Sequence, residues 1–192
     1  LGAAVARTRE GGTGVLLIEA PAGVGKSRLV SSARVLGREA GLRVLEAHGA
    51  VLEQEFAFGV ARQLFEHPVG AASEAERDAL FAGAAGLSRR LLGHEGPEVF
   101  PESGDSAFGS LHGLYWLTAN LSDQGPLLLA VDDAHWADPS SLRFLAYLLR
   151  RLEGLSVLLV AAGRGPDPEG EPLWHELADD PAAEVLRPRA LS

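Results

Sequence analysis

The stretch LLIEAPAGVGKSRL, residues 16–29, constrains the fold more than any other part of the sequence. Residues 14–19 form a short apolar run with glycines on both flanks, which predicts a buried strand. Residues 25–40 follow with helical spacing. We expect the apolar face of this helix to consist of Leu29, Val30, Ala33, Leu36 and Ala40, and Gly41 to end it. A strand that turns through glycines directly into a helix is typical of α/β proteins.

The rest of the chain continues this alternation. Further strands are predicted at residues 43–47, 127–131, 155–164 and 184–186, and helices at 56–66, 73–92, 106–121, 138–152 and 173–177. Ser73 and Glu76 have the spacing of a capping box, and Asp138 followed by Pro139 is a strong helix start. Residues 93–105 are expected to be a loop. Because the strands are apolar throughout, they predict a parallel β-sheet flanked by helices on both faces.

Residues 20–27, APAGVGKS, have the pattern of a phosphate-binding loop with alanine in place of its first glycine. Gly23 and Gly25 allow successive backbone N–H groups to point inward, and the following helix adds the positive end of its dipole. Lys26 is the only lysine beside sixteen arginines, and a compact ammonium can bridge terminal phosphates where a planar guanidinium cannot. The candidate nucleotide-binding residues are Ala20, Pro21, Ala22, Gly23, Val24, Gly25, Lys26, Ser27 and Arg28.

Three further side chains are candidates for the same site. Asp132 and Asp133 follow a buried strand; Asp132, together with the hydroxyl of Ser27, is the expected Mg²⁺ ligand, and Asp133 is expected to orient water. Arg164 ends a later strand and is expected to sense the γ-phosphate. The candidate catalytic residues are therefore Asp133, Lys26 and Arg164.

Neighbouring polar residues have plainer interpretations. His135 and Trp136 are expected chiefly to pack the start of the next helix, and Asp138 to cap it. His48, His67 and His94 lack the spacing of metal ligands. The net charge of −9 argues against a grip on nucleic acid, no apolar run reaches the roughly 18 residues that a membrane span needs, and the absence of cysteine excludes disulfides. A cytoplasmic location is the default expectation.

Four segments together resemble a known family. PAGVGKSRLV, EQEFAFGVARQLFE, LHGLYWL and PLLLAVDDAHWADPSSLRFLAYLLRRL are similar to the ATPase module of the large ATP-binding LuxR-family regulators, which are common in actinomycetes. These regulators belong to the STAND class of AAA+-related P-loop NTPases. The resemblance implies Walker A at residues 20–27, Walker B at 127–133 with its acidic pair Asp132 and Asp133, a helical insert at about 56–122, a sensor at Arg164 and strand order 5-1-4-3-2.

The resemblance also sets the expected boundaries and partners. Residues 1–192 are expected to be a truncated ATPase core, without the helical lid, the winged helix or the DNA-binding helix-turn-helix that such regulators carry. The implied cofactors are ATP and Mg²⁺. The implied partners are ATP or ADP, the rest of a longer chain and another copy in self-association, with no direct nucleic-acid contact and no membrane contact by this segment.

The function expected on these grounds is an ATP-binding, slowly ATP-hydrolysing regulatory switch. Two alternatives remain open. The first is an interaction platform that binds nucleotide without turnover. The second is a P-loop kinase for a small molecule, although such kinases usually carry an arginine-rich lid and residues 70–104 contain only Arg77, Arg89 and Arg90.

Overall fold

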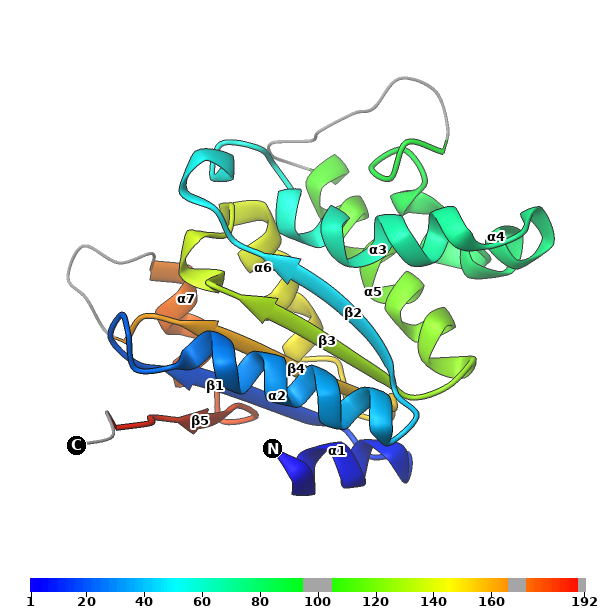
Figure 1. The fold of residues 1–192 in the computed structure, drawn as a ribbon. Coiled ribbons are helices and arrows are strands. Elements are labelled where there is room, and N and C mark those ends of the chain that lie inside the picture. Colours follow the sequence, from blue (N-terminus) through cyan, green and yellow to red (C-terminus); the bar gives the residue numbers. More distant parts are fainter. Residues whose placement is uncertain (95–104, 166–171, 190–192) are drawn as a thin grey trace.

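The computed structural model describes residues 1–94, 105–165 and 172–189. Its centre is a five-stranded sheet with the order β2-β3-β4-β1-β5, in which every neighbouring pair is parallel (Figure 1). The strands are β1 (Gly14–Glu19), β2 (Arg43–His48), β3 (Leu127–Asp132), β4 (Val157–Gly163) and β5 (Glu184–Leu186). The predicted fold class, an all-parallel P-loop NTPase sheet with strand order 5-1-4-3-2, is confirmed.

Helices cover both faces of the sheet. On one face, α1 (Gly2–Arg9) and α2 (Lys26–Glu39) bury an apolar cluster with residues such as Leu16, Ile18 and Val160 of the central strands. The cluster on the other face includes residues of α3 (Gly59–Ala71), α5 (Asp105–Asp123), α6 (Pro139–Leu149) and α7 (Pro172–Asp179). Shorter elements are α4 (Glu74–Leu80) and the 3₁₀ turns η1 (Val51–Glu53), η2 (Gly83–Ser88) and η3 (Ala134–Trp136).

The register of the strands brings their carboxyl ends to one edge of the sheet. Glu19 of β1 lies beside Gly163 of β4, and His48 of β2 lies beside Asp132 of β3. The segments that follow β1, β2, β3 and β4 therefore leave the sheet next to one another. This is the edge at which open parallel sheets hold ligands.

Several helix boundaries differ from the sequence predictions. The helix expected at 56–66 begins at Gly59 and continues to Ala71 through Pro68. The helix expected at 73–92 stops at Leu80, because the chain turns at Gly83 with φ +62° and continues as a 3₁₀ turn. The capping box of Ser73 and Glu76 is confirmed. Most of the expected loop at 93–105 lies outside the described residues.

The buried face of α2 is another correction. Leu36, which was expected to be buried, is exposed, and Gly37 is buried in its place. A Cβ at Gly37 would lie only 2.8 Å from Cδ2 of Leu128. Helix α2 therefore packs closely against β3 at this point, where any added side chain would have to displace the end of the Leu128 side chain, and a hydrophobicity pattern does not reveal such a position.

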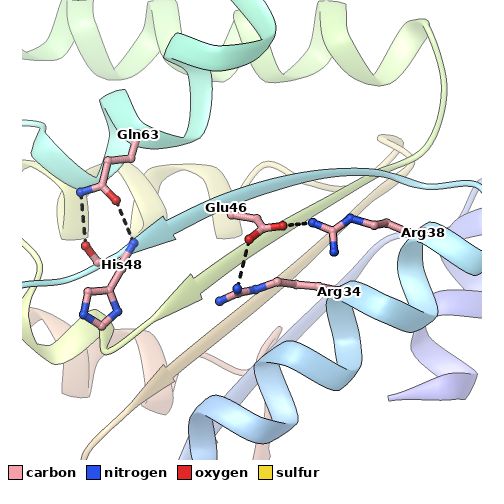
Figure 2. Close-up of polar contacts among 5 residues, drawn as sticks. All are labelled: Arg34, Arg38, Glu46, His48 and Gln63. Carbon is pink, nitrogen blue, oxygen red and sulfur yellow. Dashed lines mark hydrogen bonds and ion pairs between the residues drawn. The ribbon is translucent and has the colours of Figure 1, made fainter.

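β2 is an edge strand whose carboxyl end is fixed by side chains (Figure 2). The amide of Gln63 on α3 accepts a hydrogen bond from the backbone N–H of His48 at 2.9 Å and donates one to its carbonyl oxygen at 3.3 Å. On the other side, Glu46 pairs with Arg34 at 3.0 Å and with Arg38. Gln63 thus satisfies backbone groups that an edge strand would otherwise leave unpaired.

Candidate nucleotide-binding site

The loop after β1 has the backbone conformation expected of a phosphate cradle. Gly23 and Gly25 adopt φ values of +83° and +99°, a region that side chains other than glycine rarely adopt. A Cβ built on either glycine would meet no atom within 4 Å, so backbone conformation rather than lack of space requires glycine here. Gly25 is the N-cap of α2 and provides no side-chain cap, so the first N–H groups of this 14-residue helix remain available for a ligand.

Lys26 points back into the loop rather than out to solvent. Only 7% of the residue is exposed, and Nζ donates hydrogen bonds to the carbonyl oxygens of Ala20 at 2.9 Å and Pro21 at 3.1 Å. A buried ammonium held only by neutral carbonyls is not neutralised by a direct carboxylate partner. This is a favourable position for an anion to occupy.

The acidic pair lies at the end of β3. Asp132 is buried, and its Oδ1 accepts a hydrogen bond from the backbone N–H of Asp133 at 2.9 Å. Asp133 has φ +47°, one of two non-glycine residues with positive φ in the described part of the chain. Such strain is commonest at functional sites, and Asp tolerates this region better than most residues.

Gly49, which directly follows β2, packs against the turn at Asp133. Its N–H donates to the carbonyl oxygen of Asp132 at 2.9 Å, which extends the β2–β3 ladder by one bond. A Cβ on Gly49 would overlap the carbonyl oxygen of Asp133 and approach the nitrogen of Ala137 to 2.9 Å. The segment after β2 is therefore pressed directly against the turn that carries the acidic pair.

His135 lies among the charged groups of the site. The pKa of its imidazole is lowered to about 4, chiefly by burial; the charge of Asp133 partly opposes this, Arg164 and Lys26 add to it, and Asp132 opposes it slightly. Both ring nitrogens are buried without a hydrogen-bond partner among the described residues, and Nδ1 lies 3.9 Å from Oδ1 of Asp133. The imidazole is therefore neutral at neutral pH and can both donate and accept a hydrogen bond. The packing expected from the sequence is present, since the His135 ring lies against that of Trp136 with their centroids 4.8 Å apart.

Arg164 follows β4 directly and reaches the same edge of the sheet. Its guanidinium lies over the ring of Trp136, 5.3 Å from the centroid, and its carbonyl oxygen accepts a hydrogen bond from Nε1 of Trp174 at 2.8 Å. Arg164 also acts on the pKa of His135. The structure therefore brings the predicted Lys26, Asp132, Asp133 and Arg164 into one electrostatic environment around His135.

Two structural features of the site were not foreseen. Glu19, the last residue of β1, is buried and accepts hydrogen bonds from Nε and Nη2 of Arg187 at 3.1 and 2.8 Å. This ion pair connects the base of the loop to the segment after β5. The side chain of Asp138, expected to cap only α6, also binds backbone N–H groups at the start of α3. Long-range partners of this kind have no local sequence signal.

The family comparison agrees with this geometry. A family model described as "AAA ATPase domain" matches residues 1–160. The chain belongs to this family. As an AAA ATPase domain it is expected to use a nucleotide, typically with Mg²⁺. No curated protein matches the chain.

Solved structures with a similar course of the chain are distant in sequence. A chain from a Drosophila ORC structure, bound to GC-rich DNA and Cdc6, is 16% identical with a TM-score of 0.47, and the match covers 98% of this AAA ATPase domain and 53% of that chain. A chain from a second Drosophila ORC structure, bound to AT-rich DNA and Cdc6, is 13% identical with a TM-score of 0.44 over 95% and 50% of the two chains. The domain thus spans about half the length of these solved chains.

Two other features are absent from the part of the chain that the structure describes. No cluster of three or more His, Asp or Glu side chains with the geometry of a metal site occurs in residues 1–94, 105–165 and 172–189. In the same ranges, no helix is both long enough and apolar enough to cross a membrane.

Proposed function

We propose that this AAA ATPase domain binds MgATP at residues 20–28, hydrolyses it slowly and serves as a regulatory switch in a LuxR-family transcriptional activator. The observation that supports nucleotide binding most directly is Lys26. Its buried ammonium lies inside a glycine loop, at the uncapped start of a helix, with a buried carboxylate at the end of a nearby strand. These are the groups that hold a triphosphate and its metal in P-loop proteins.

The residues present fit a nucleotide and Mg²⁺. On binding, Lys26 would exchange two neutral carbonyl partners for phosphate oxygens, which are stronger acceptors for an ammonium. The first N–H groups of α2 would bind the same phosphates. Ser27 and Asp132 would supply the two protein oxygens of the Mg²⁺ shell, because Mg²⁺ at nucleotide sites takes few protein ligands and completes its octahedron with phosphates and water. Bound Mg²⁺ would neutralise charge that develops on the phosphates.

Asp133, His135 and Arg164 would carry out the hydrolytic role. The Asp133 carboxylate would accept a proton from the attacking water and orient it. The neutral imidazole of His135, whose Nδ1 lies 3.9 Å from Oδ1 of Asp133, would orient that carboxylate by a hydrogen bond that requires no charge on the ring. Arg164 would contact the γ-phosphate and so distinguish the triphosphate from the diphosphate state.

Calorimetry with MgATP tests the binding site. Lys26→Ala is expected to reduce affinity at least about 100-fold, the effect of losing a charge-assisted contact to phosphate at a buried position. Arg38→Ala is the matched control, because Arg38 is a cation of the same helix that pairs with Glu46 instead. Equal affinities of wild type and Lys26→Ala would remove the proposal.

Phosphate release tests the switch against its alternatives. We expect slow turnover by the wild type and none by Asp133→Asn, with Asp123→Asn as a surface control. Binding without turnover in the wild type would favour a platform that does not hydrolyse ATP. A strong rise in turnover on addition of a small-molecule acceptor would favour a kinase.

The regulatory role is proposed from the resemblance to LuxR-family regulators and from the contact that Arg164 would make with the γ-phosphate. The partners on this proposal are ATP, ADP and the remaining domains of a longer cytoplasmic chain, among them a C-terminal helix-turn-helix. The coding sequence downstream of Ser192 tests this directly. We expect a helical repeat region followed by a helix-turn-helix, and a stop codon soon after Ser192 would contradict it.

A further inference from the structure

Two tryptophans hold Arg164, one at its main chain and one at its side chain. Nε1 of Trp174 on α7 donates a hydrogen bond to the carbonyl oxygen of Arg164 at 2.8 Å. The guanidinium lies over the ring of Trp136 in η3, with 5.3 Å between Cζ and the ring centroid. The whole chain has three tryptophans, so two of them contact the one residue that directly follows β4.

The contact with Trp174 fixes the backbone from which the Arg164 side chain extends. Trp174 is 1% exposed, and a Cβ on Gly163 would lie 2.5 Å from Cε2 of its indole. Any larger residue at position 163 would therefore have to displace a buried ring. Gly163 is also in register with Glu19 of β1, directly before the phosphate loop. The main chain of Arg164 thus starts from a fixed point at the edge of the site.

The ring of Trp136 belongs to an equally restrained segment. The backbone N–H of Trp136 donates to the carbonyl oxygen of Asp133 at 2.8 Å, within the turn that carries the acidic pair. A Cβ on Gly49 would lie 3.0 Å from the carbonyl carbon of Trp136, and the Trp136 ring packs against the buried imidazole of His135. A side chain whose own position is locked by packing can in turn fix the group that rests on it.

Contact with a ring leaves the hydrogen-bond donors of an arginine free. A guanidinium is planar, so one of its faces can rest on an aromatic ring while its N–H groups point outward in the plane. Arg164 is exposed, and within the described part of the chain no ion pair or side-chain hydrogen bond involves its guanidinium. A carboxylate would restrain the side chain but occupy these donors. The indole restrains it and leaves them open to a phosphate.

We propose that Trp136 is the positioning residue of Arg164 and holds its guanidinium in the orientation that binds the γ-phosphate; the assignment rests on the proposed function, which gives Arg164 that contact. A cation–π contact is weaker than a charge-assisted hydrogen bond to phosphate, so the nucleotide can engage the guanidinium without displacing a strong partner. ADP has no γ-phosphate. Trp136 therefore sets how strongly the site prefers ATP over ADP.

Calorimetry with MgATP and with MgADP tests this role, because the ratio of the two dissociation constants isolates the contact with the γ-phosphate. Trp136→Leu is expected to lower the preference for ATP about fivefold and to leave the affinity for MgADP unchanged. Trp136→Phe keeps an aromatic ring with weaker cation–π attraction, and is expected to lower the preference only about twofold. Arg164→Ala removes the contact itself and is expected to lower the preference at least about tenfold.

Two variants serve as matched comparisons. Trp116→Leu makes the same substitution at a tryptophan of α5 that is 41% exposed, and is expected to leave both affinities at the wild-type value. Arg164→Lys leaves every tryptophan and its packing in place, so it also tests the role if Trp136→Leu does not fold. It keeps the charge but has no planar face to rest on the indole, and we expect a loss of preference of about fivefold. Full preference for ATP in Arg164→Lys would overturn the proposal.

A double-mutant cycle separates positioning from damage to the fold. In the Arg164→Ala background, Trp136→Leu is expected to cause no further loss of preference, because the side chain that it positions is gone. An equal loss in both backgrounds would mean that Trp136 only supports the turn at Asp133. An equal loss of affinity for MgATP and MgADP in Trp136→Leu would mean the same. Either result would overturn the proposal.

Failure of the nucleotide site itself gives a different result. Lys26→Ala is expected to weaken MgATP and MgADP alike, because both carry the phosphates that the loop binds. If Arg164→Ala keeps the wild-type preference for ATP, Arg164 does not contact the γ-phosphate, and the roles of both residues are wrong. If Arg164→Ala lowers the preference and Trp136→Leu does not, the role of Arg164 stands and only that of Trp136 is overturned.

Discussion

The backbone N–H of Phe58 donates a 2.7 Å hydrogen bond to Oδ1 of Asp138, a residue 80 positions later in the chain. Oδ1 of Asp138 also accepts from the N–H of Ser141 at 2.8 Å, and Oδ2 accepts from the N–H of Val60 at 3.3 Å. Ser141 adds a fourth bond, from the N–H of Ala61 to its hydroxyl oxygen. Asp138 and Ser141, shortly after the acidic pair in the sequence, therefore bind the backbone at the start of α3, and Asp138 also caps α6.

Replacement of Asp138 by alanine is expected to destabilise the domain more than loss of an ordinary helix cap. The substitution leaves three buried N–H groups without an acceptor, and we expect a loss of about 3 kcal/mol in the free energy of unfolding. Ser73→Ala is the matched control, because Ser73 caps only its own exposed helix and should cost about 1 kcal/mol. Urea unfolding of the two variants measures the difference, and equal losses would mean that the bonds to α3 contribute nothing.

Gly49→Ala is expected to disturb the acidic pair from outside the loop. The added methyl group overlaps the carbonyl oxygen of Asp133, so the Asp133 turn must move or the end of β2 must detach from it. We expect a loss of about 2 kcal/mol in stability and a fall in ATP turnover that is larger than the fall in ATP affinity. Gly70→Ala is the control, because a Cβ at Gly70 meets nothing within 4 Å. Unchanged turnover in Gly49→Ala would show that the turn tolerates displacement.

The sequence predicted the sheet better than the helical layers, for a physical reason. Strands buried on both faces, such as β3, are apolar at every position, and the signal of β1 is reinforced by the glycine loop that must follow it. The bounds of β1 and β5 were predicted to the residue. By contrast, Leu36 is exposed and Gly37 is buried, because the short distance between α2 and β3, and not hydrophobicity, decides which of them faces the sheet.

The candidate site shows the same division. Local patterns were sufficient to place Lys26, Asp132 and Asp133, because each is adjacent in sequence to the element that positions it. The residues next to His135 in the sequence give no indication that Arg164 and Lys26 also lower the pKa of its imidazole. The bonds from Phe58 to Asp138 and from Arg187 to Glu19 likewise join residues whose proximity depends on the complete topology.

Two glycines of α5 are expected to respond to alanine with opposite signs. A Cβ at Gly113 would lie 2.6 Å from the nitrogen of Ser88, so Gly113→Ala is expected to destabilise the domain by about 2 kcal/mol. A Cβ at Gly109 meets nothing within 4 Å, so Gly109→Ala is expected to stabilise it by roughly 0.5 to 1 kcal/mol through higher helix propensity. Thermal unfolding of both variants decides this, and a shift of the same sign in both would contradict the close packing of η2 on α5.

His135 is expected to give the stability of the domain a specific pH dependence. Its pKa is about 4 in the folded protein and near 6.5 when unfolded, so between these values the unfolded chain binds a proton that the folded chain does not. Stability should therefore fall as the pH is lowered from about 6.5 to about 4, by at most about 1.4 kcal/mol per pH unit from this one group. His135→Asn keeps a polar side chain but cannot titrate, so its stability curve should lack this contribution while it shares the titration of the carboxylates. Unfolding free energies measured from pH 8 to pH 4 should diverge in slope only below about pH 6.5, and parallel curves would show that the imidazole is not held neutral by burial.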